Sequence, residues 1–455
     1  MRMRIRHAFS LLFICGSFFL VLIWSYPTDV NKWVDTIKTV YNQRNVSQID
    51  PHRQDALLAV TVPSNGTLCG TPHLPSRDLR EQQKWIEIEN NVSYAFSAFY
   101  DNLSDPTVRV VGVKAYKVKR QMKCRLWFPE DDISGGMLVV EADIWTIPNI
   151  KVRYRFGSVV FICRVPVTSI PYGVAMISSG CEYVSEVLPI LSNTSESREV
   201  TICISPLHSK YDKLSELVES IELNKILGAN KFFFYNHSSS SNINLILKWY
   251  VDNNLAEVIN WPPFTKGGLT YFGQLAALND CLFRNRYSSR FIVNQDLDEF
   301  ITPRKTDTWV GLIKDIDPNS SACVYNFRQR RFSVNWNDTD TEFSDKHLAQ
   351  KYKSKTLLKL THENYTFNYP DRSKYIIRPL EVELAGIHRI YRTRSGCKNH
   401  IVNPDIALLH HYRKFPGNSK TRIADDTMLK YKDRLLKSLA DAWSRFEHLP
   451  LGTSS

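Results

Sequence analysis

The chain has 455 residues, of which 43% are hydrophobic and 12% are aromatic, and its formal net charge is +12. This length has room for about two domains, and the apolar content excludes a disordered protein. The positive charge leaves nucleic acid, an anionic membrane surface and phosphate-bearing substrates as classes of partner.

An uncharged, mostly apolar run at residues 8–26 has about the length that a helix needs to cross a bilayer. Arg2, Arg4 and Arg6 precede the run, whereas the charges that follow it are balanced. The positive-inside rule therefore predicts a cytoplasmic tail at 1–7, a single-pass signal anchor at 8–26 and a lumenal chain after it. A cleaved signal peptide is the alternative, and the bulky end of the run disfavours it because no small-x-small cleavage site is present.

Glycosylation sequons and cysteines agree with a lumenal location. Nine Asn-x-Ser/Thr sequons lie beyond the apolar run, at Asn45, Asn65, Asn91, Asn102, Asn193, Asn236, Asn319, Asn337 and Asn364. Cys15 lies inside the run, and the other eight cysteines can pair in an oxidising lumen, although the sequence does not give their connectivity. Since a lumenal chain does not meet chromatin, nucleic acid is excluded as a partner.

Residues 27–91 are polar, with scattered proline and glycine, and we interpret them as a stem that holds one helix around 80–89. Short alternating apolar runs follow at residues 107–116, 121–128, 137–145 and 158–163. They predict a small antiparallel β-rich domain over 92–195. This region has no cluster of catalytic residue types, so its expected role is structural, with sugar binding as the alternative.

Over residues 196–449 the periodicity alternates between strands and helices. Strands are predicted at 200–205, 231–235, 256–261 and 291–293, and helices at 245–250, at 271–286 and from Leu214 to a cap at Gly228. Such short units imply an α/β fold with a parallel, Rossmann-like sheet and crossover helices, which binds ligands at the carboxyl ends of its strands. A charged amphipathic helix is expected at 420–449. The sequence has no GxGxxG or P-loop motif, which disfavours a dinucleotide dehydrogenase or a P-loop NTPase.

The predicted strand at 291–293 ends in three carboxylates, Asp296, Asp298 and Glu299. Residues two apart in a strand point to the same side, so Asp296 and Asp298 can converge on one ion. Carboxylate oxygens suit Mg or Mn, which commonly hold substrate phosphates as well. This stretch therefore predicts a divalent metal site, with a capped or solvated turn as the alternative.

Three ordered motifs make the chain similar to a known family. They are Glu219-Ser-Ile-Glu with Leu227-Gly-Ala-Asn-Lys-Phe-Phe-Phe-Tyr-Asn236, then Gly273-Gln-Leu-Ala-Ala-Leu-Asn-Asp-Cys281, then Asp296-Leu-Asp-Glu-Phe300. Together they resemble glycosyltransferase family 92 over residues 199–448. The resemblance implies a type II Golgi membrane protein with a GT-A fold and a divalent metal, expected to be Mn with Mg as the alternative. It also implies a UDP-sugar donor, usually UDP-galactose, and inverting transfer to a glycan acceptor that gives a β-linkage.

The resemblance carries over to individual residues. Asp296 and Asp298 match the metal-binding Asp-x-Asp, and His411 of the His-Tyr-Arg signature is expected to complete the site, with neighbouring His410 or a core histidine as the alternatives. The residues expected to bind the nucleotide-sugar are Gln274, Asn279, Asp280, Lys374 and His388. An inverting reaction needs a carboxylate base, for which the candidates are Glu299, Asp425 and Asp426, with Glu381 and Glu383 as further candidates.

Three interpretations follow from these patterns. The first is a membrane-anchored galactosyltransferase of the Golgi lumen. The second is a catalytically silent lectin or receptor that retains the fold, and the third is a transferase that uses a different UDP-sugar. The expected partners are the donor, a glycan acceptor on a glycoprotein or polysaccharide, and the Golgi membrane, and a homodimer is left open.

Overall fold

The computed structural model describes residues 80–129, 132, 136–148, 154–178, 186–191, 197–337, 341–415 and 421–449. The predicted tail, the signal anchor, most of the stem, Cys69 and Cys181 lie outside these residues. Within them, no helix combines the length and the apolar character needed to cross a membrane.

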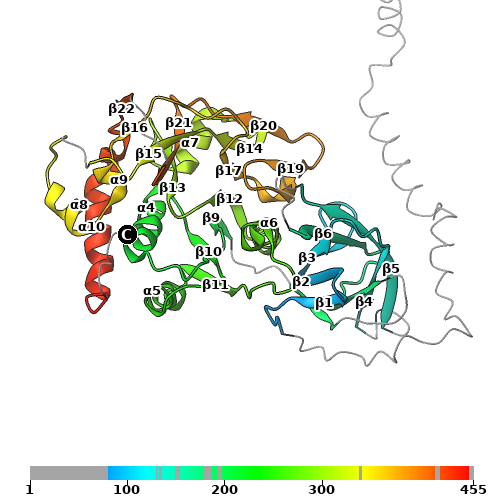
Figure 1. Cartoon of the computed structure of the whole chain (residues 1–455). Helices are drawn as coiled ribbons and strands as arrows, with labels where there is room; N and C mark the ends of the chain where they lie inside the picture. Colours follow the sequence, from blue (N-terminus) through cyan, green and yellow to red (C-terminus); the bar gives the residue numbers. More distant parts are fainter. Residues whose placement is uncertain are drawn as a thin grey trace, which may run out of the picture. The chain divides into compact units, whose positions relative to one another are not determined.

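The first part of the described chain is an eight-stranded sheet with the order β1-β2-β3-β6-β5-β4-β7-β8 (Figure 1). Its strands are β1 (Ile86–Glu89), β2 (Ser93–Asp101), β3 (Thr107–Ala115), β4 (Met122–Trp127), β5 (Met137–Thr146), β6 (Phe156–Arg164), β7 (Gly173–Ser178) and β8 (Leu188–Leu191). Strand β8 also pairs with β2 and closes a barrel. Apart from this parallel pair, all neighbouring strands are antiparallel, as the alternating runs predict.

One expectation for this region is wrong. The helix expected around residues 80–89 is absent, and Ile86–Glu89 form strand β1 instead, with a burial pattern that alternates along the strand. Ile86 and Ile88 point into the barrel core, a period of two that a strand satisfies and a helix does not. Inside the barrel, a disulfide joins Cys124 of β4 to Cys163 of β6.

The second part is a seven-stranded sheet with the order β11-β10-β9-β12-β17-β14-β20. Its parallel half is built from β9 (Arg198–Ile204), α4 (Leu214–Leu227), β10 (Lys231–Asn236), α5 (Ser241–Asp252), β11 (Ala256–Asn260), α6 (Gln274–Arg284) and β12 (Ser289–Gln295). Strand β17 (Lys374–Ile377) adds antiparallel to β12, and β14 (Ala322–Phe327) and β20 (Lys398–Ile401) follow it. The strand order reverses at β9, because β10 lies on one side of it and β12 on the other.

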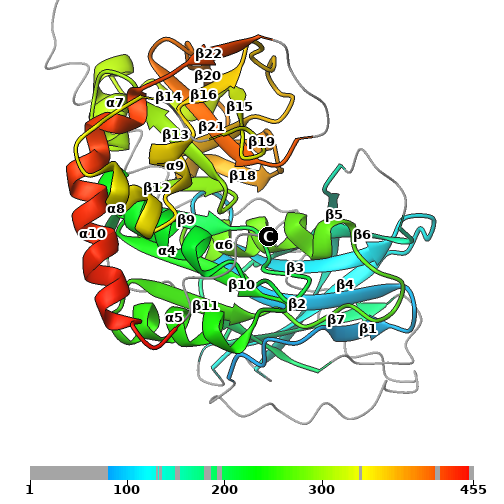
Figure 2. The same ribbon diagram turned by 60° about the vertical axis from the view of Figure 1, so that its left-hand side comes forward.

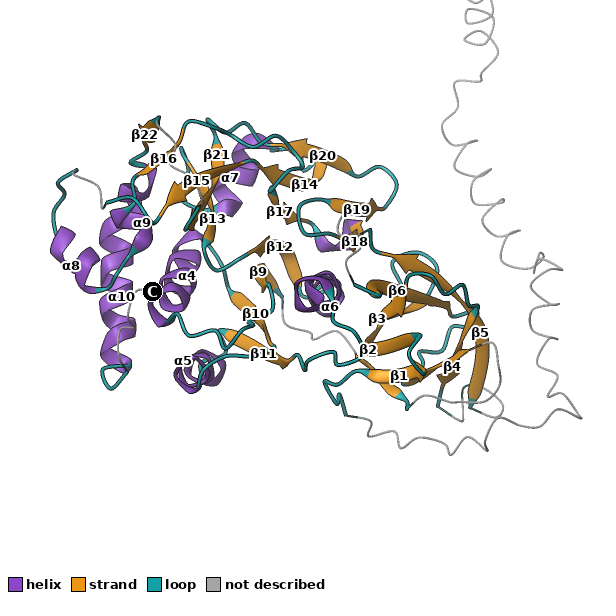
Figure 3. Cartoon of the chain, in the orientation of Figure 1, coloured by secondary structure: helices purple, strands orange, loops and turns teal. Residues whose placement is uncertain are grey.

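Alternating residues of the strands explain why helices cover both faces of the sheet (Figure 3). Phe232 and Phe234 of β10 belong to the core that includes residues of α4 and α5, whereas Phe233 and Tyr235 belong to the core that includes α6. Helix α4 ends where predicted: Gly228 has a φ of 115° and caps it in the left-handed conformation that glycine tolerates best. A disulfide between Cys203 and Cys281 joins β9 to α6.

A separate sheet of three strands, with the order β13-β21-β15, begins directly after Asp296 and Asp298. Its strands are β13 (Glu299–Pro303), β21 (Ala407–Arg413) and β15 (Gln329–Ser333). The remaining α-helices and strands of the described residues are α7 (Trp309–Ile316), α8 (Lys346–Lys351), α9 (Lys355–Leu358), β16 (Thr361–Glu363), β18 (Val382–Ala385), β19 (Ile390–Thr393), β22 (Arg422–Ala424) and α10 (Lys432–Arg445). Helix α10 lies against α4 (Figure 2), and its Leu435, Leu436 and Leu439 belong to the same hydrophobic core as residues of α4. The helix is shorter than the one predicted at 420–449.

Candidate active site

The predicted acidic stretch lies at the point where the strand order reverses. The carboxyl ends of β9 and β12 meet there, and an open α/β sheet forms its ligand-binding crevice at such a point. Ser205 follows β9 directly and Asp296 follows β12 directly, and the Ser205 hydroxyl donates a hydrogen bond to Asp296 Oδ1. The Gln274 amide donates to Ser205 and lies 3.5 Å from Asp296 Oδ1. The structure therefore brings Gln274 to the acidic stretch, while its role in donor binding stays a prediction, and Ser205 is a residue that the sequence did not indicate.

Lys374, the first residue of β17, supplies a positive charge to this cluster. Its side chain is fully buried, and its Nζ lies 3.1 Å from Asp296 Oδ2 and 3.3 Å from Glu299 Oε2. Burial alone would lower the pKa of Lys374, but the two carboxylates outweigh burial and raise it above its ordinary value. Burial would likewise raise the pKa of Asp296, but the Lys374 ammonium and the Ser205 hydroxyl lower it to about 2. Asp296 is 36% exposed, so a ligand can reach it.

Glu299, the first residue of β13, is held from both sides. Its Oε1 accepts a hydrogen bond from Gln329 Nε2 at 3.2 Å, and its Oε2 accepts one from the backbone N–H of Asp296 at 3.2 Å. The side chain is only 3% exposed, and burial raises its pKa despite the neighbouring Lys374. These contacts place Glu299 as a support of the acidic turn, and no face of its carboxylate is left for the base role that the sequence suggested.

Asp298 faces His411 across the β13–β21 pair. The backbone N–H of Tyr412 donates to Asp298 O at 2.8 Å, which fixes the end of the turn on β21. His411 Nε2 lies 3.4 Å from Asp298 Oδ2, is buried and makes no hydrogen bond, while Nδ1 lies 2.7 Å from Gln329 Nε2. Burial would lower the pKa of His411, but Glu299 and Asp298 outweigh it and raise the pKa.

These side chains can be compared with the needs of a divalent ion. Among the described residues, no group of three or more His, Cys, Asp or Glu side chains is placed to hold a metal ion. Asp298 Oδ2 and His411 Nε2, which makes no hydrogen bond, do face each other, and the carboxylate oxygen suits Mn or Mg. Such ions are commonly held by one or two carboxylates and complete their shell with water and substrate phosphates. The residues therefore fit such an ion, and a metal held by Asp296, Asp298 and His411 stays a prediction.

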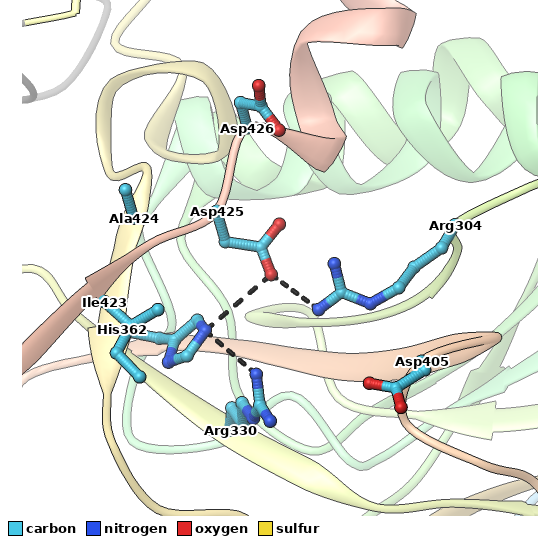
Figure 4. A pocket seen from close by; sticks show the side chains of 8 residues that line it. All are labelled: Arg304, Arg330, His362, Asp405, Ile423, Ala424, Asp425 and Asp426. Carbon is cyan, nitrogen blue, oxygen red and sulfur yellow. Dashed lines mark hydrogen bonds and ion pairs between the residues drawn. The ribbon is translucent and has the colours of Figure 1, made fainter.

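His410 and the candidate bases Asp425 and Asp426 lie elsewhere. His410 is fully buried, its ring stacks on Phe332 with centroids 4.3 Å apart, and burial lowers its pKa to about 3. Figure 4 shows Asp425 between Arg304 and His362, with Nη2 of Arg304 2.7 Å from Asp425 Oδ2. Arg304, His362 and Asp425 line a pocket of about 290 Å³, together with Arg330, Asp405, Ile423, Ala424 and Asp426.

Register explains why these groups are separate from the acidic cluster. Arg330 of β15 pairs with His410, and Arg331 pairs with His411, so the two histidines point to opposite faces of the three-stranded sheet. The pocket of Figure 4 lies on the His410 side, because Asp425, Arg304 and His362 are the charged groups that act on His410. The structure therefore places Asp425 and Asp426 away from Asp296 and Asp298, which removes the support for a base role.

Asn279 and Asp280, two of the predicted donor-binding residues, are structural in this fold. Both are fully buried. Asn279 exchanges hydrogen bonds of 2.9 Å with the backbone of Ala385 and so fixes β18 against α6. Asp280 accepts hydrogen bonds from Ser97 of the barrel and Tyr235 of β10 and pairs with Arg284. Neither carboxylate nor amide has surface left for a ligand, so their assignment to the donor is corrected.

His388, the last predicted donor-binding residue, lies beside the cluster. Its Nδ1 lies 3.1 Å from Ser373 O, the residue before Lys374, so Nδ1 carries the proton and Nε2 is an acceptor. Burial and the charge of Lys374 together lower the pKa of His388 to about 4. A neutral, half-buried imidazole next to the acidic cluster can accept a hydrogen bond from a ligand hydroxyl.

The chain enters α6 through a left-handed elbow, which we define as residues Thr270–Gly273. Tyr271 has φ/ψ of 48°/43°, Phe272 has 57°/30°, and Gly273 has a φ of 81°. Left-handed backbone costs about 1–2 kcal/mol for each non-glycine residue and rarely extends beyond one residue. The helix predicted at 271–286 is therefore wrong at its start, since α6 begins at Gln274. The sequence contains no signal for this elbow.

The point where the strand order reverses carries two aspartates, a buried lysine and a histidine. This arrangement is typical of α/β enzymes that bind charged ligands at the carboxyl edge of the sheet. Residues 198–440 match the family model of glycosyltransferase family 92, and the chain belongs to that family. It is 25% identical over 241 residues to the β-1,4-galactosyltransferase galt-1 of Caenorhabditis elegans, with 51% of each chain covered.

A second relative extends the match toward the barrel. The chain is 22% identical over 356 residues to a glycosyltransferase family 92 protein of Caenorhabditis elegans. The aligned region covers 75% of this chain and 66% of the relative. The chain thus spans about half the length of the first relative and just under two thirds of the second. A solved glucosyl-3-phosphoglycerate synthase of Mycobacterium tuberculosis covers 56% of this chain and 81% of its own at 11% identity, and its TM-score of 0.24 is too low to carry an argument.

Proposed function

We propose that this chain is a metal-dependent, inverting glycosyltransferase that moves galactose from UDP-galactose to a hydroxyl group of a glycan acceptor and forms a β-linkage. Family membership and the similarity to a β-1,4-galactosyltransferase support this reaction class and this donor. The observation that carries the proposal is the pair of aspartates after β12, where Asp296 contacts Lys374 and Asp298 faces His411. Another UDP-sugar as donor is the alternative.

The chemistry explains why such a cluster suits the transfer. When the bond between the sugar and the diphosphate breaks, negative charge develops on the leaving nucleotide, and a bound divalent ion neutralises that charge. Asp298 and His411 would hold the ion, while Lys374 keeps Asp296 ionised at neutral pH. Gln274 and Ser205 fix the orientation of the Asp296 carboxylate toward the crevice. His388 offers an acceptor for a sugar hydroxyl.

The proposed setting is the Golgi lumen, with a type II signal anchor at residues 8–26. The arginines before the apolar run and the sequons after it support this orientation. Three disulfides among the described residues, Cys124–Cys163, Cys203–Cys281 and Cys323–Cys397, are compatible with an oxidising compartment.

The test is transfer by the full chain from a panel of UDP-sugars, with Mn²⁺, measured as UDP release and as product mass. Asp298→Asn should lower the rate about 100-fold or more, because it removes a carboxylate that would hold the ion neutralising the leaving nucleotide. Asp315→Asn is the matched control, since Asp315 belongs to a second Asp-x-Asp copy, is exposed and lies on α7. Undiminished transfer by Asp298→Asn would refute the metal role, and sugar binding by the wild type without any turnover would favour the lectin interpretation.

A further inference from the structure

The left-handed elbow is held in place by the surrounding structure. Trp261 Nε1 donates to Phe272 O at 2.8 Å, and the backbone N–H of Phe272 donates to Leu269 O at 3.2 Å. Gly273 is packed so tightly that an added Cβ would lie 3.3 Å from the Trp261 ring nitrogen and 3.3 Å from Leu269 Cδ1. A costly backbone conformation that several contacts enforce is typical of ligand clamps and other functional sites.

The elbow exposes two aromatic rings. Tyr271 is 54% exposed and Phe272 is 38% exposed, although both belong to residue types that folding tends to bury. His208 stacks on Phe272 with ring centroids 4.1 Å apart and planes only 16° from parallel, and His237 contacts the same ring at 5.0 Å. The strained backbone thus holds an exposed aromatic surface, which we call the aromatic platform and define as Phe272 and the His208 ring stacked on it, with the exposed Tyr271 next to Phe272 in the chain.

The aromatic platform adjoins the acidic cluster through one short connection. Phe272 is two residues before Gln274, whose amide lies 3.5 Å from Asp296 Oδ1. His208 follows β9 and His237 follows β10, the first two strands of the unit β9-α4-β10-α5-β11. In doubly wound sheets a β-α-β-α-β unit of this kind binds one mononucleotide at the carboxyl ends of its strands. A ligand whose phosphates lie at Asp296 would therefore extend its nucleoside over these strands.

We propose that the aromatic platform is the stacking site for the planar base of the nucleotide donor. A base offers a flat π-face that stacks on aromatic rings, and the stacked Phe272 and His208 are such rings beside the carboxyl end of the sheet. The elbow holds these rings before the ligand arrives. This inference rests on the proposed function and deepens it, because it assigns the base of the donor to residues outside the acidic cluster.

The experiment compares two substitutions of one residue in the full chain. Phe272→Ala and Phe272→Gly both remove the ring, but only glycine adopts the left-handed backbone without strain, so Phe272→Gly should melt about 2 °C or more above Phe272→Ala. Both variants should bind UDP and uridine about 5- to 150-fold more weakly than the wild type, which is about 1–3 kcal/mol. Inorganic pyrophosphate with Mn²⁺ should bind unchanged, because the platform does not contact phosphate.

A matched pair of controls is Ser320→Ala and Ser320→Gly, since Ser320 has a φ of 53° and is exposed in the loop before β14. This pair should differ in melting temperature and not in ligand binding. The inference is overturned if the Phe272 variants bind UDP like the wild type, if pyrophosphate weakens as much as UDP, or if only Phe272→Ala weakens it. Loss of acceptor glycan binding alone would assign the platform to the acceptor instead. Failure of the wild type to bind any nucleotide with Mn²⁺ would refute the proposed function itself.

Discussion

The buried Lys374 is expected to control the stability of the acidic cluster, and Lys374→Met tests this. The pKa of Asp296 is lowered from 3.8 to about 2, a difference equal to about 2.5 kcal/mol. Because Asp296 is 36% exposed, solvent screening reduces this to about 1–1.5 kcal/mol. Glu299 is only 3% exposed and would lose its cation as well. Breaking a buried ion pair typically costs 3–5 kcal/mol, so we expect about 3 kcal/mol at pH 7.5.

The dependence of this loss on pH has a defined sign. A carboxyl with a lowered folded pKa stabilises the fold above its unfolded pKa and loses that contribution as pH falls through the folded value. Without Lys374, the folded pKa of Asp296 should rise above its unfolded value and that of Glu299, already raised by burial, should rise further, so the variant takes up more protons on folding near pH 5 than the wild type does. One proton taken up changes stability by about 1.4 kcal/mol per pH unit. The deficit of Lys374→Met should therefore be at least about 1 kcal/mol smaller at pH 5 than at pH 7.5.

Urea denaturation of the wild type and the variant at both pH values, in EDTA, measures this difference. Lys231→Met is the matched control, because Lys231 is also buried but donates mainly to Asn254 and lies 3.7 Å from the exposed Glu257. Its deficit should hardly change between the two pH values. A deficit of Lys374→Met that is equal at pH 5 and pH 7.5, or below about 1 kcal/mol, would refute the role of Lys374 as the counter-charge of the cluster.

Two further substitutions separate supporting residues from ligand-binding ones. Gln329→Leu removes the amide that contacts both His411 and Glu299, and it should weaken Mn²⁺ binding about 10- to 100-fold, measured by titration calorimetry, since partners of metal ligands orient them. Asp280→Asn removes the carboxylate that pairs with Arg284 and should destabilise the fold by about 3 kcal/mol in urea denaturation. In the same variant, UDP affinity at low temperature should equal that of the wild type, and a selective loss of UDP binding would restore the ligand role that the sequence suggested.

Local patterns were sufficient to predict the parallel half of the sheet. Phe232 to Tyr235 form a short continuous apolar strand because both faces of β10 are covered by helices. Gly228 marked the end of α4 because glycine is favoured at a left-handed cap. The acids after β12 marked the crevice because parallel strands place their carboxyl ends at one edge. Each of these signals depends on neighbours within a few residues.

The remaining features depend on contacts between distant segments. Asp280 lies on α6 with no sequence signal that the barrel covers this side, and its partner Ser97 is 183 residues away. The contact between Lys374 and Glu299 also has no local sequence signal. It forms because β17, which begins at Lys374, pairs with β12 although a long segment of chain separates the two strands. The sequence predicts Tyr271 and Phe272 as helix because two adjacent aromatic residues give no sign of a left-handed backbone. That conformation is held by the hydrogen bond from Trp261 to Phe272 O, a contact that the local sequence does not reveal.

The structure gives the two aspartates of the Asp-x-Asp different environments, although the sequence treats them alike. Asp296 is bound by Ser205 and Lys374, so its negative charge is already balanced by a residue of the chain. Among the described residues no lysine or arginine pairs with Asp298, which is 18% exposed and faces only the titratable His411, with Nε2 3.4 Å from Asp298 Oδ2. A divalent ion gains more from an unbalanced carboxylate than from one that a lysine neutralises, because the ammonium repels it. We therefore propose that, where a divalent ion binds, Asp298 and His411 would be the stronger pair of ligands, and Asp296 would orient the phosphates that such an ion holds.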